Sequence, residues 1–99
     1  MAAELVLAPE AHLDIVEAYA WYEARRPGLG EEFLGSLDAS MESLRRNPEM
    51  CPVVHGVYRR ALIRRFPYAV FYEYAEARIT VYAVLHASRG PQKTRERLP

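Results

Sequence analysis

The hydrophobic pattern of the chain changes its period once, between Asn47 and Pro52, and this change constrains the fold more than any other feature. Before it, apolar side chains recur at spacings of three and four, as on one face of a helix: Ile15, Val16, Tyr19 and Tyr22, and then Phe33, Leu37, Met41 and Leu44. After it, β-branched and aromatic residues dominate short segments that read as strands. Helices followed by strands predict an α+β fold.

Proline and glycine mark where the predicted elements begin and end. Residues 3–8 read as a short strand, and Pro9 suits the first position of a helix that ends near Arg26. The segment 27–30 breaks this helix, and a second helix runs from there to Asn47-Pro48. The link is so short that the two helices must form an antiparallel hairpin.

The second half predicts a three-stranded antiparallel meander over residues 57–65, 68–75 and 78–86. A two-residue turn at Glu76-Ala77 pairs Tyr72 with Val81 and Tyr68 with Leu85. The helical hairpin is then expected on the face that carries Ala61, Ile63, Val70, Tyr72, Val81 and Leu85. The opposite, open face is expected to carry Arg60, Arg64, Phe71, Tyr82, Val84 and His86. The tail from Arg89 onward shows no apolar repeat and is expected to be irregular.

Length and composition predict one globular domain over residues 1–99, in a reducing, cytoplasmic setting. The chain has one cysteine, Cys51, and neither a signal-peptide pattern nor an apolar run long enough for a membrane span. Its net charge is zero, but the two halves of the chain have opposite charges. Residues 1–50 carry four basic and ten acidic side chains, whereas residues 51–99 carry nine basic and three acidic side chains. Such asymmetry points to a nucleic-acid or acidic protein partner.

Few residues suggest catalysis or metal binding. Arginines beside aromatic side chains on an open sheet suit single-stranded nucleic acid, but they also suit a strand face that is simply solvated. His86 can act as a general acid or base near neutral pH, or it can be structural. Cys51 and His55 lack the second ligand pair of a zinc site, and no nucleotide-binding or hydrolase motif is present, so we expect no metal and no cofactor.

The segments YRRALIRRFPYAVFYEY and ITVYAVLHASRGP carry a family resemblance, supported by AYAWYEARRPGLGEEF in the helical half. They resemble the RelE/ParE superfamily, the toxins of bacterial type II toxin–antitoxin modules. The resemblance implies that a cognate antitoxin neutralises the chain. It also implies either a ParE-like action on a cellular enzyme such as DNA gyrase, or RelE-like cleavage of messenger RNA on the ribosome. A non-toxic interaction module of the same fold is the third alternative.

The same resemblance assigns site residues. Arg60 and Arg89 match basic positions of RelE-like nucleases, and Arg95 lies near the place of their C-terminal tyrosine. Leu62 and Ala69 stand where those nucleases carry basic residues, which favours a ParE-like toxin over an endoribonuclease. Arg60, Arg64, His86 and Arg89 are therefore the expected target-facing residues, whether or not they catalyse. Arg59 and Arg65 are expected to reach helix carboxylates such as Glu17 or Glu42 instead.

Overall fold

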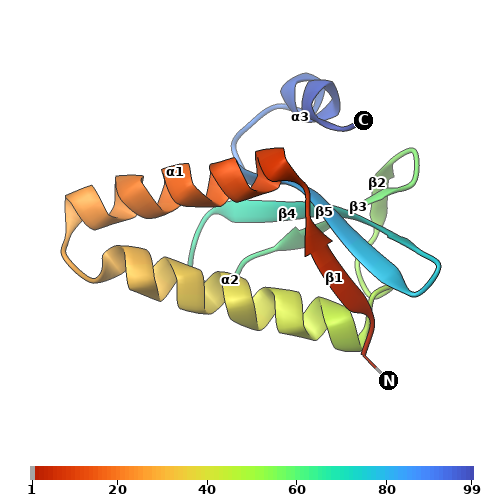
Figure 1. Ribbon diagram of the computed structural model, residues 1–99. Helices are drawn as coiled ribbons and strands as arrows, with labels where there is room; N and C mark the ends of the chain where they lie inside the picture. The colour runs from red at the N-terminus through yellow and green to blue at the C-terminus, as the bar shows by residue number, and fades with distance from the viewer. Residues whose placement is uncertain (1) are drawn as a thin grey trace.

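The computed structural model describes residues 2–99 and confirms the predicted α+β architecture. Strand β1 (Glu4–Leu7) leads into helix α1 (Pro9–Arg25) and helix α2 (Leu29–Arg46), which form the antiparallel hairpin (Figure 1). Strands β2 (Val53–His55), β3 (Tyr58–Leu62), β4 (Tyr68–Ala75) and β5 (Arg78–His86) follow, and helix α3 (Pro91–Arg97) ends the chain. The sheet order is β1-β5-β4-β3-β2, and only β1 runs parallel to its neighbour.

The helical hairpin packs on one face of the sheet, as predicted. Tyr22, Phe33, Leu37 and Leu44 are buried against the strand residues Ala61, Val70, Tyr72, Ile79 and Val81 and against Ile63, which follows β3. Val16, in contrast, was expected in this core and is 52% exposed. Ala11, Ala18 and Tyr22 fill the core side of α1, and a helix turns about 100° per residue, so Val16 points away from the sheet.

The register between β4 and β5 is as predicted near the turn and wrong farther along. Tyr72 pairs with Val81, but a bulge at Tyr82 shifts the rest by one residue, so that Tyr68 pairs with His86. Val84 therefore packs toward the helices, whereas Ala83 and Leu85 lie in the cluster on the opposite face. The sequence had predicted the reverse for Val84 and Leu85. It had also placed His86 on the open face by alternation, whereas His86 pairs with Tyr68 at the end of β5.

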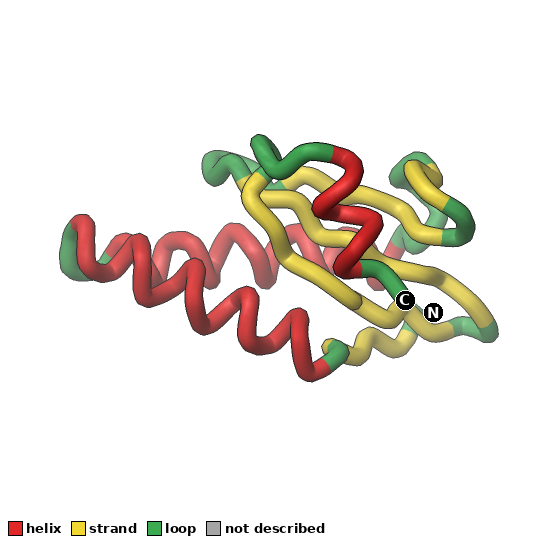
Figure 2. The backbone as a smooth tube through the Cα atoms, turned by 90° about the horizontal axis from the view of Figure 1, so that it is seen from above, coloured by secondary structure: helices red, strands yellow, loops and turns green. Residues whose placement is uncertain are grey.

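Two elements were not predicted. The short strand β2 pairs with β3 at Tyr58 and Arg59, and β3 ends at Leu62 rather than Arg65. The tail, expected to be irregular, forms α3, and Leu98 packs against Ala69, Phe71, Ala83 and Leu85. Figure 2 shows α3 lying over the strands, beside the helical hairpin. The face of the sheet predicted to be open is thus partly covered by the end of the chain.

Candidate functional site

A basic pocket lies where β5 ends and α3 begins, on the sheet face opposite the helical hairpin. We call it the strand-end pocket; it encloses about 320 Å³. It is lined by Val54, His55, Arg60, Phe71, His86, Ala87, Arg89, Pro91, Thr94 and Arg95. Three of the four predicted site residues, Arg60, His86 and Arg89, therefore come together, and His55 and Arg95 join them.

Strand geometry explains how the walls of this pocket form. Arg60 on β3 pairs with Phe71 on β4, so both side chains point away from the helices. His86 is the last residue of β5, and the turn that follows it carries Arg89 to the mouth of the pocket. The α3 helix then returns across the sheet and adds Arg95.

The charges in the strand-end pocket are all of one sign. Arginine and histidine supply its ionisable side chains, and no carboxylate among the described residues 2–99 lines it. Within residues 2–99, Arg60, Arg89 and Arg95 form no ion pair, whereas Arg59, Arg65 and Arg97 each hold a carboxylate. A pocket with three uncompensated guanidinium groups attracts phosphate or carboxylate.

His86 has a defined tautomer in this arrangement. Its Nδ1 accepts a hydrogen bond from the backbone N–H of Ser88 at 3.1 Å, and the Ser88 hydroxyl lies 2.7 Å from the same atom. A backbone N–H can only donate, so in the neutral ring the hydrogen is carried by Nε2. The ring also packs edge-on against Tyr68, with centroids 5.3 Å apart. Nε2 is therefore the nitrogen that can donate to a ligand.

Asp14 of α1 holds the wall of the pocket that α3 provides. Its carboxylate accepts two hydrogen bonds from the Arg97 guanidinium, at 3.0 and 2.9 Å, and a third from the backbone N–H of Val84 at 3.0 Å. The hydrogen bonds that Arg97 donates to Asp14 raise the pKa of the Arg97 guanidinium. Asp14 thus ties α1, the bulged end of β5 and α3 together, and sequence reasoning missed all three contacts. A local signal was present only for the start of α3, because Gly90 followed by Pro91 is typical of a helix start.

Arg64 does not join this pocket. It lies beside a separate groove of about 630 Å³ between α2 and β3, which we call the α2–β3 groove. The groove is lined by Glu32, Gly35, Ser36, Ala39, Ser40, Ser43, Met50, Cys51, Ala61, Leu62, Arg64 and Arg65. The chain leaves β3 at Leu62, so the strand alternation that was expected to align Arg64 with Arg60 has already ended.

The paired arginines also differ from expectation in their partners. Arg65 bonds to Glu32 of α2 at 3.2 Å, not to Glu17 or Glu42. Arg59 donates to the carbonyl oxygens of Glu49 and Cys51, at 3.1 and 2.7 Å. Both arginines therefore bind the helical side of the molecule, but through Glu32 and the loop that follows α2.

The two positions where RelE-like nucleases carry basic residues contribute no charge here. Ala69 is fully buried beneath the end of the chain, next to Leu98. Leu62 is 62% exposed and lines the α2–β3 groove instead of the strand-end pocket.

Within residues 2–99 no cluster of three His, Cys, Asp or Glu side chains is placed to hold a metal ion. The helices of that range are also too short or too polar to cross a membrane.

Comparisons with known proteins agree with this geometry. The sequence model of the family described as "ParE toxin of type II toxin-antitoxin system, parDE" matches residues 5–91. A chromosomal ParDE toxin–antitoxin structure from P. aeruginosa is similar, with a TM-score of 0.78 at 13% identity, covering 88% of this chain and 98% of that one. The toxin–antitoxin complex RelBE2 from Mycobacterium tuberculosis aligns with a TM-score of 0.62 at 13% identity, over 87% and 99% of the two chains. No curated protein sequence matches. Because the family match spans most of the chain and the fold agrees with it, this chain belongs to the ParE toxin family of type II toxin–antitoxin systems.

Proposed function

We propose that this toxin inhibits growth by binding a cytoplasmic enzyme, with DNA gyrase as the target, and that it does not cleave RNA. The observation that carries the proposal is the strand-end pocket. Arg60, Arg89 and Arg95 form a cationic surface suited to an acidic or phosphate-bearing partner, without the further cations that RNA cleavage needs.

Cleavage of RNA by its own 2′-hydroxyl needs a base, an acid for the leaving oxygen and cations around the phosphorane. Each well-placed group typically contributes about 10²–10⁴-fold to the rate. Leu62 and Ala69 supply none of this, since both side chains are apolar and Ala69 is fully buried. Binding is therefore the better-supported activity.

Ribosome-dependent cleavage of messenger RNA is the second candidate, and one observation favours it. His86 lines the same pocket as Arg60 and Arg89, and its Nε2 is the protonated nitrogen of the neutral ring. This arrangement could serve an acid–base step. If this candidate holds, His86→Ala abolishes transcript cleavage.

The target experiment combines purified proteins and cells. The toxin is added to gyrase supercoiling assays and, separately, to ribosomes translating a defined messenger RNA, while induced cells are scored for growth, DNA-damage signalling and transcript ends. We expect loss of supercoiling and no new transcript ends. Transcript cleavage that depends on His86 would overturn the proposal, and normal growth would identify a non-toxic interaction module.

Charge reversals test whether the strand-end pocket is the target surface. Arg60→Glu with Arg89→Glu should abolish growth inhibition, because both arginines line the pocket and neither forms an ion pair within the described part of the chain. Arg46→Glu is the matched control, since Arg46 is exposed at the far end of α2. Arg46 and Arg89 are exposed, and exposed charges contribute only about 0–1 kcal/mol to stability; Arg60 is half-buried, so thermal melting of each variant checks that it folds. Arg64→Glu tests whether the α2–β3 groove contributes to growth inhibition.

The cognate antitoxin is expected to lie on the basic half of the chain with an extended or helical acidic segment. Its affinity should fall clearly with salt, because exposed charges are screened beyond about 10 Å at 0.1 M salt. Titration of antitoxin against toxin at several salt concentrations measures this slope. Salt-independent binding would favour the α2–β3 groove, where small side chains of α2 face Met50 and Leu62.

A further inference from the structure

The strand-end pocket is larger than its charged groups require. Its volume of about 320 Å³ falls within the range of about 300–1,000 Å³ that is usual for small-molecule sites. A single phosphate or carboxylate group would occupy only a part of this space. Val54, Phe71, Ala87 and Pro91 line the pocket as well and carry no charge. The pocket therefore has room and apolar surface for an organic group beside its three arginines.

The three arginines reach the pocket from three separate segments of the chain. Arg60 extends from β3, Arg89 from the turn after β5, and Arg95 from α3. One planar carboxylate has two oxygen atoms and is satisfied by a single guanidinium fork. A phosphate monoester has three terminal oxygen atoms and a charge of about −1.5 to −2 at pH 7, whereas an internal phosphodiester carries a single negative charge. Three guanidinium groups around one cavity therefore match the monoester best.

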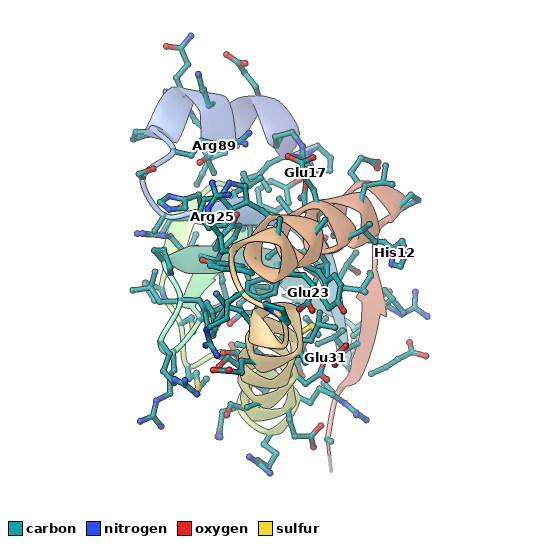
Figure 3. The ribbon with its side chains drawn as sticks, turned by 90° about the vertical axis from the view of Figure 1, so that its left-hand side faces the viewer. His12, Glu17, Glu23, Arg25, Glu31 and Arg89 are labelled. Carbon is teal, nitrogen blue, oxygen red and sulfur yellow. The ribbon has the colours of Figure 1, made fainter. Side chains whose placement is uncertain are left out.

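His86 adds a hydrogen-bond donor to this cationic lining. Its Nδ1 accepts from the Ser88 N–H, so the Nε2–H of the neutral ring is free to donate to a ligand oxygen. Asp14 and Glu17 border an adjoining hollow of about 50 Å³, but neither lines the strand-end pocket. Figure 3 shows Arg89 beneath α3 and Glu17 on the α3 side of α1. Within the described part of the chain, no acidic side chain therefore shares the pocket with the arginines.

The uncharged lining contains flat rings and almost no hydroxyl group. Phe71 is 5% exposed, and the exposed His55 has its ring nearly parallel to that of Tyr58, at 19° with centroids 6.5 Å apart. Flat rings of this kind stack on nucleic-acid bases. A sugar would instead need partners for its hydroxyl groups, and Thr94 carries the only hydroxyl among the described lining residues. The lining thus suits a base beside a phosphate.

We propose that the strand-end pocket binds a nucleotide through a terminal phosphate monoester, which lies among the three arginines while the base lies beside His55 and Phe71. Because the same pocket serves as the target surface of the toxin, this nucleotide site rests on the proposed function. A terminal phosphate monoester occurs in free mononucleotides and at the phosphorylated end of a nucleic-acid strand. A hollow of about 570 Å³ adjoins the pocket, shares His86 and Arg89 with it and adds Lys93. A following nucleotide of a strand would lie in this second cationic hollow.

The test is isothermal titration calorimetry of the full-length toxin, separated from its antitoxin, at physiological ionic strength. Deoxyadenosine monophosphate should bind about tenfold more tightly than deoxyadenosine or inorganic phosphate, because each of these lacks one half of the ligand. Arg60→Gln and Arg95→Gln should each raise the dissociation constant about tenfold, since each removes a charge-assisted hydrogen bond. Arg46→Gln, at the exposed far end of α2, is the matched control. Thermal melting checks folding, and Arg95 is exposed, so its variant stays testable if Arg60→Gln unfolds.

A short oligodeoxyadenylate, with and without a 5′-phosphate, distinguishes the two sources of the ligand. A phosphorylated strand that binds more tightly than both its unphosphorylated form and the mononucleotide assigns the pocket to the end of a strand. Tight binding of the mononucleotide alone assigns it to a free nucleotide. An unphosphorylated strand that binds as tightly as the mononucleotide overturns the proposal, because internal phosphodiesters then suffice. Equal binding of deoxyadenosine, of inorganic phosphate and of the mononucleotide overturns it as well, as does binding that survives both arginine variants.

The titration contains no gyrase, so its outcome is separate from that of the supercoiling assay. Gyrase inhibition by a toxin that binds no phosphorylated probe overturns the nucleotide site alone. Nucleotide binding by a toxin that leaves supercoiling unchanged overturns the proposed target alone.

Discussion

Replacing Asp14 by alanine should destabilise the toxin far more than an ordinary change on a helix surface. The side chain is 14% exposed, and it holds Arg97 through two hydrogen bonds and the Val84 N–H through one. Charge-assisted hydrogen bonds contribute about 1.5–3 kcal/mol, and a buried N–H left without an acceptor costs about 1–3 kcal/mol. These contributions overlap, because α3 can relax, so we expect a loss of about 2–4 kcal/mol in the free energy of unfolding.

Asp14→Asn separates the two contributions. The asparagine carbonyl can still accept from Val84, while the charge that holds Arg97 is lost, so this variant should lose only about 1–2 kcal/mol. Urea unfolding of both variants, together with Arg97→Ala and the Asp14/Arg97 double variant, gives the coupling energy between the two side chains. A cycle over contacting residues of this kind should return about 0.5–3 kcal/mol.

The control is Asp38→Ala, which removes an exposed carboxylate from α2. It should change stability by less than about 0.5 kcal/mol. If Asp14→Ala costs as little as Asp38→Ala, the ties among α1, β5 and α3 do not stabilise the fold. If Asp14→Ala and Asp14→Asn cost the same, the Val84 hydrogen bond contributes nothing and the bulge is held by the sheet alone.

Three further predictions concern the core. Leu37→Ala should cost about 2–5 kcal/mol in urea unfolding, because Leu37 is 1% exposed; a loss below about 0.5 kcal/mol would contradict the packing of the hairpin. Gly30→Ala should lower the free energy of unfolding by about 1–3 kcal/mol, because the added Cβ would lie 2.8 Å from the Tyr19 ring. At Gly35 an added Cβ meets nothing within 4 Å, so Gly35→Ala should raise the free energy of unfolding by about 0.5–1 kcal/mol. Burial raises the pKa of Tyr72 above its usual 10.0. The free energy of unfolding that the protonated Tyr72 contributes is therefore fully present below pH 10 and decreases as the pH rises above it. In unfolding curves measured at alkaline pH, Tyr72→Phe should reduce this decrease.

The elements with a clear hydrophobic period could be predicted from the sequence. The two helices and the turn at Glu76-Ala77 follow local rules, and the pairing of Tyr72 with Val81 follows from that turn. The bulge at Tyr82 could not be predicted. Residues 81–85 are all apolar and the strand is covered on both faces, so alternation carries no information about which side chain faces the helices.

The end of the chain was missed for a different reason. Helix α3 has seven residues, too few to be stable alone, and most of its side chains are polar. It forms because Leu98 packs on the sheet and Arg97 reaches Asp14, eighty-three residues earlier in the sequence. Contacts of that kind leave no local pattern, so Arg95 could not be assigned to the strand-end pocket from the spacing of residues.

The four arginines of the RRALIRR segment show how far alternation alone can place charged residues. Along β3 it holds: Arg59 turns to the helical side and bonds to the loop after α2, while Arg60 turns to the strand-end pocket. Beyond Leu62 the strand has ended, and Arg65 adopts a left-handed backbone conformation with a φ of 72°. Beyond this point the alternation of a strand no longer determines on which face a side chain lies. Arg64 and Arg65 therefore both border the α2–β3 groove. Among the described residues, oxygen atoms of the fold hold Arg59 and Arg65 but not Arg60 and Arg64, and these two line different concavities. A partner that contacts Arg60 in the strand-end pocket therefore need not contact Arg64, which borders the α2–β3 groove.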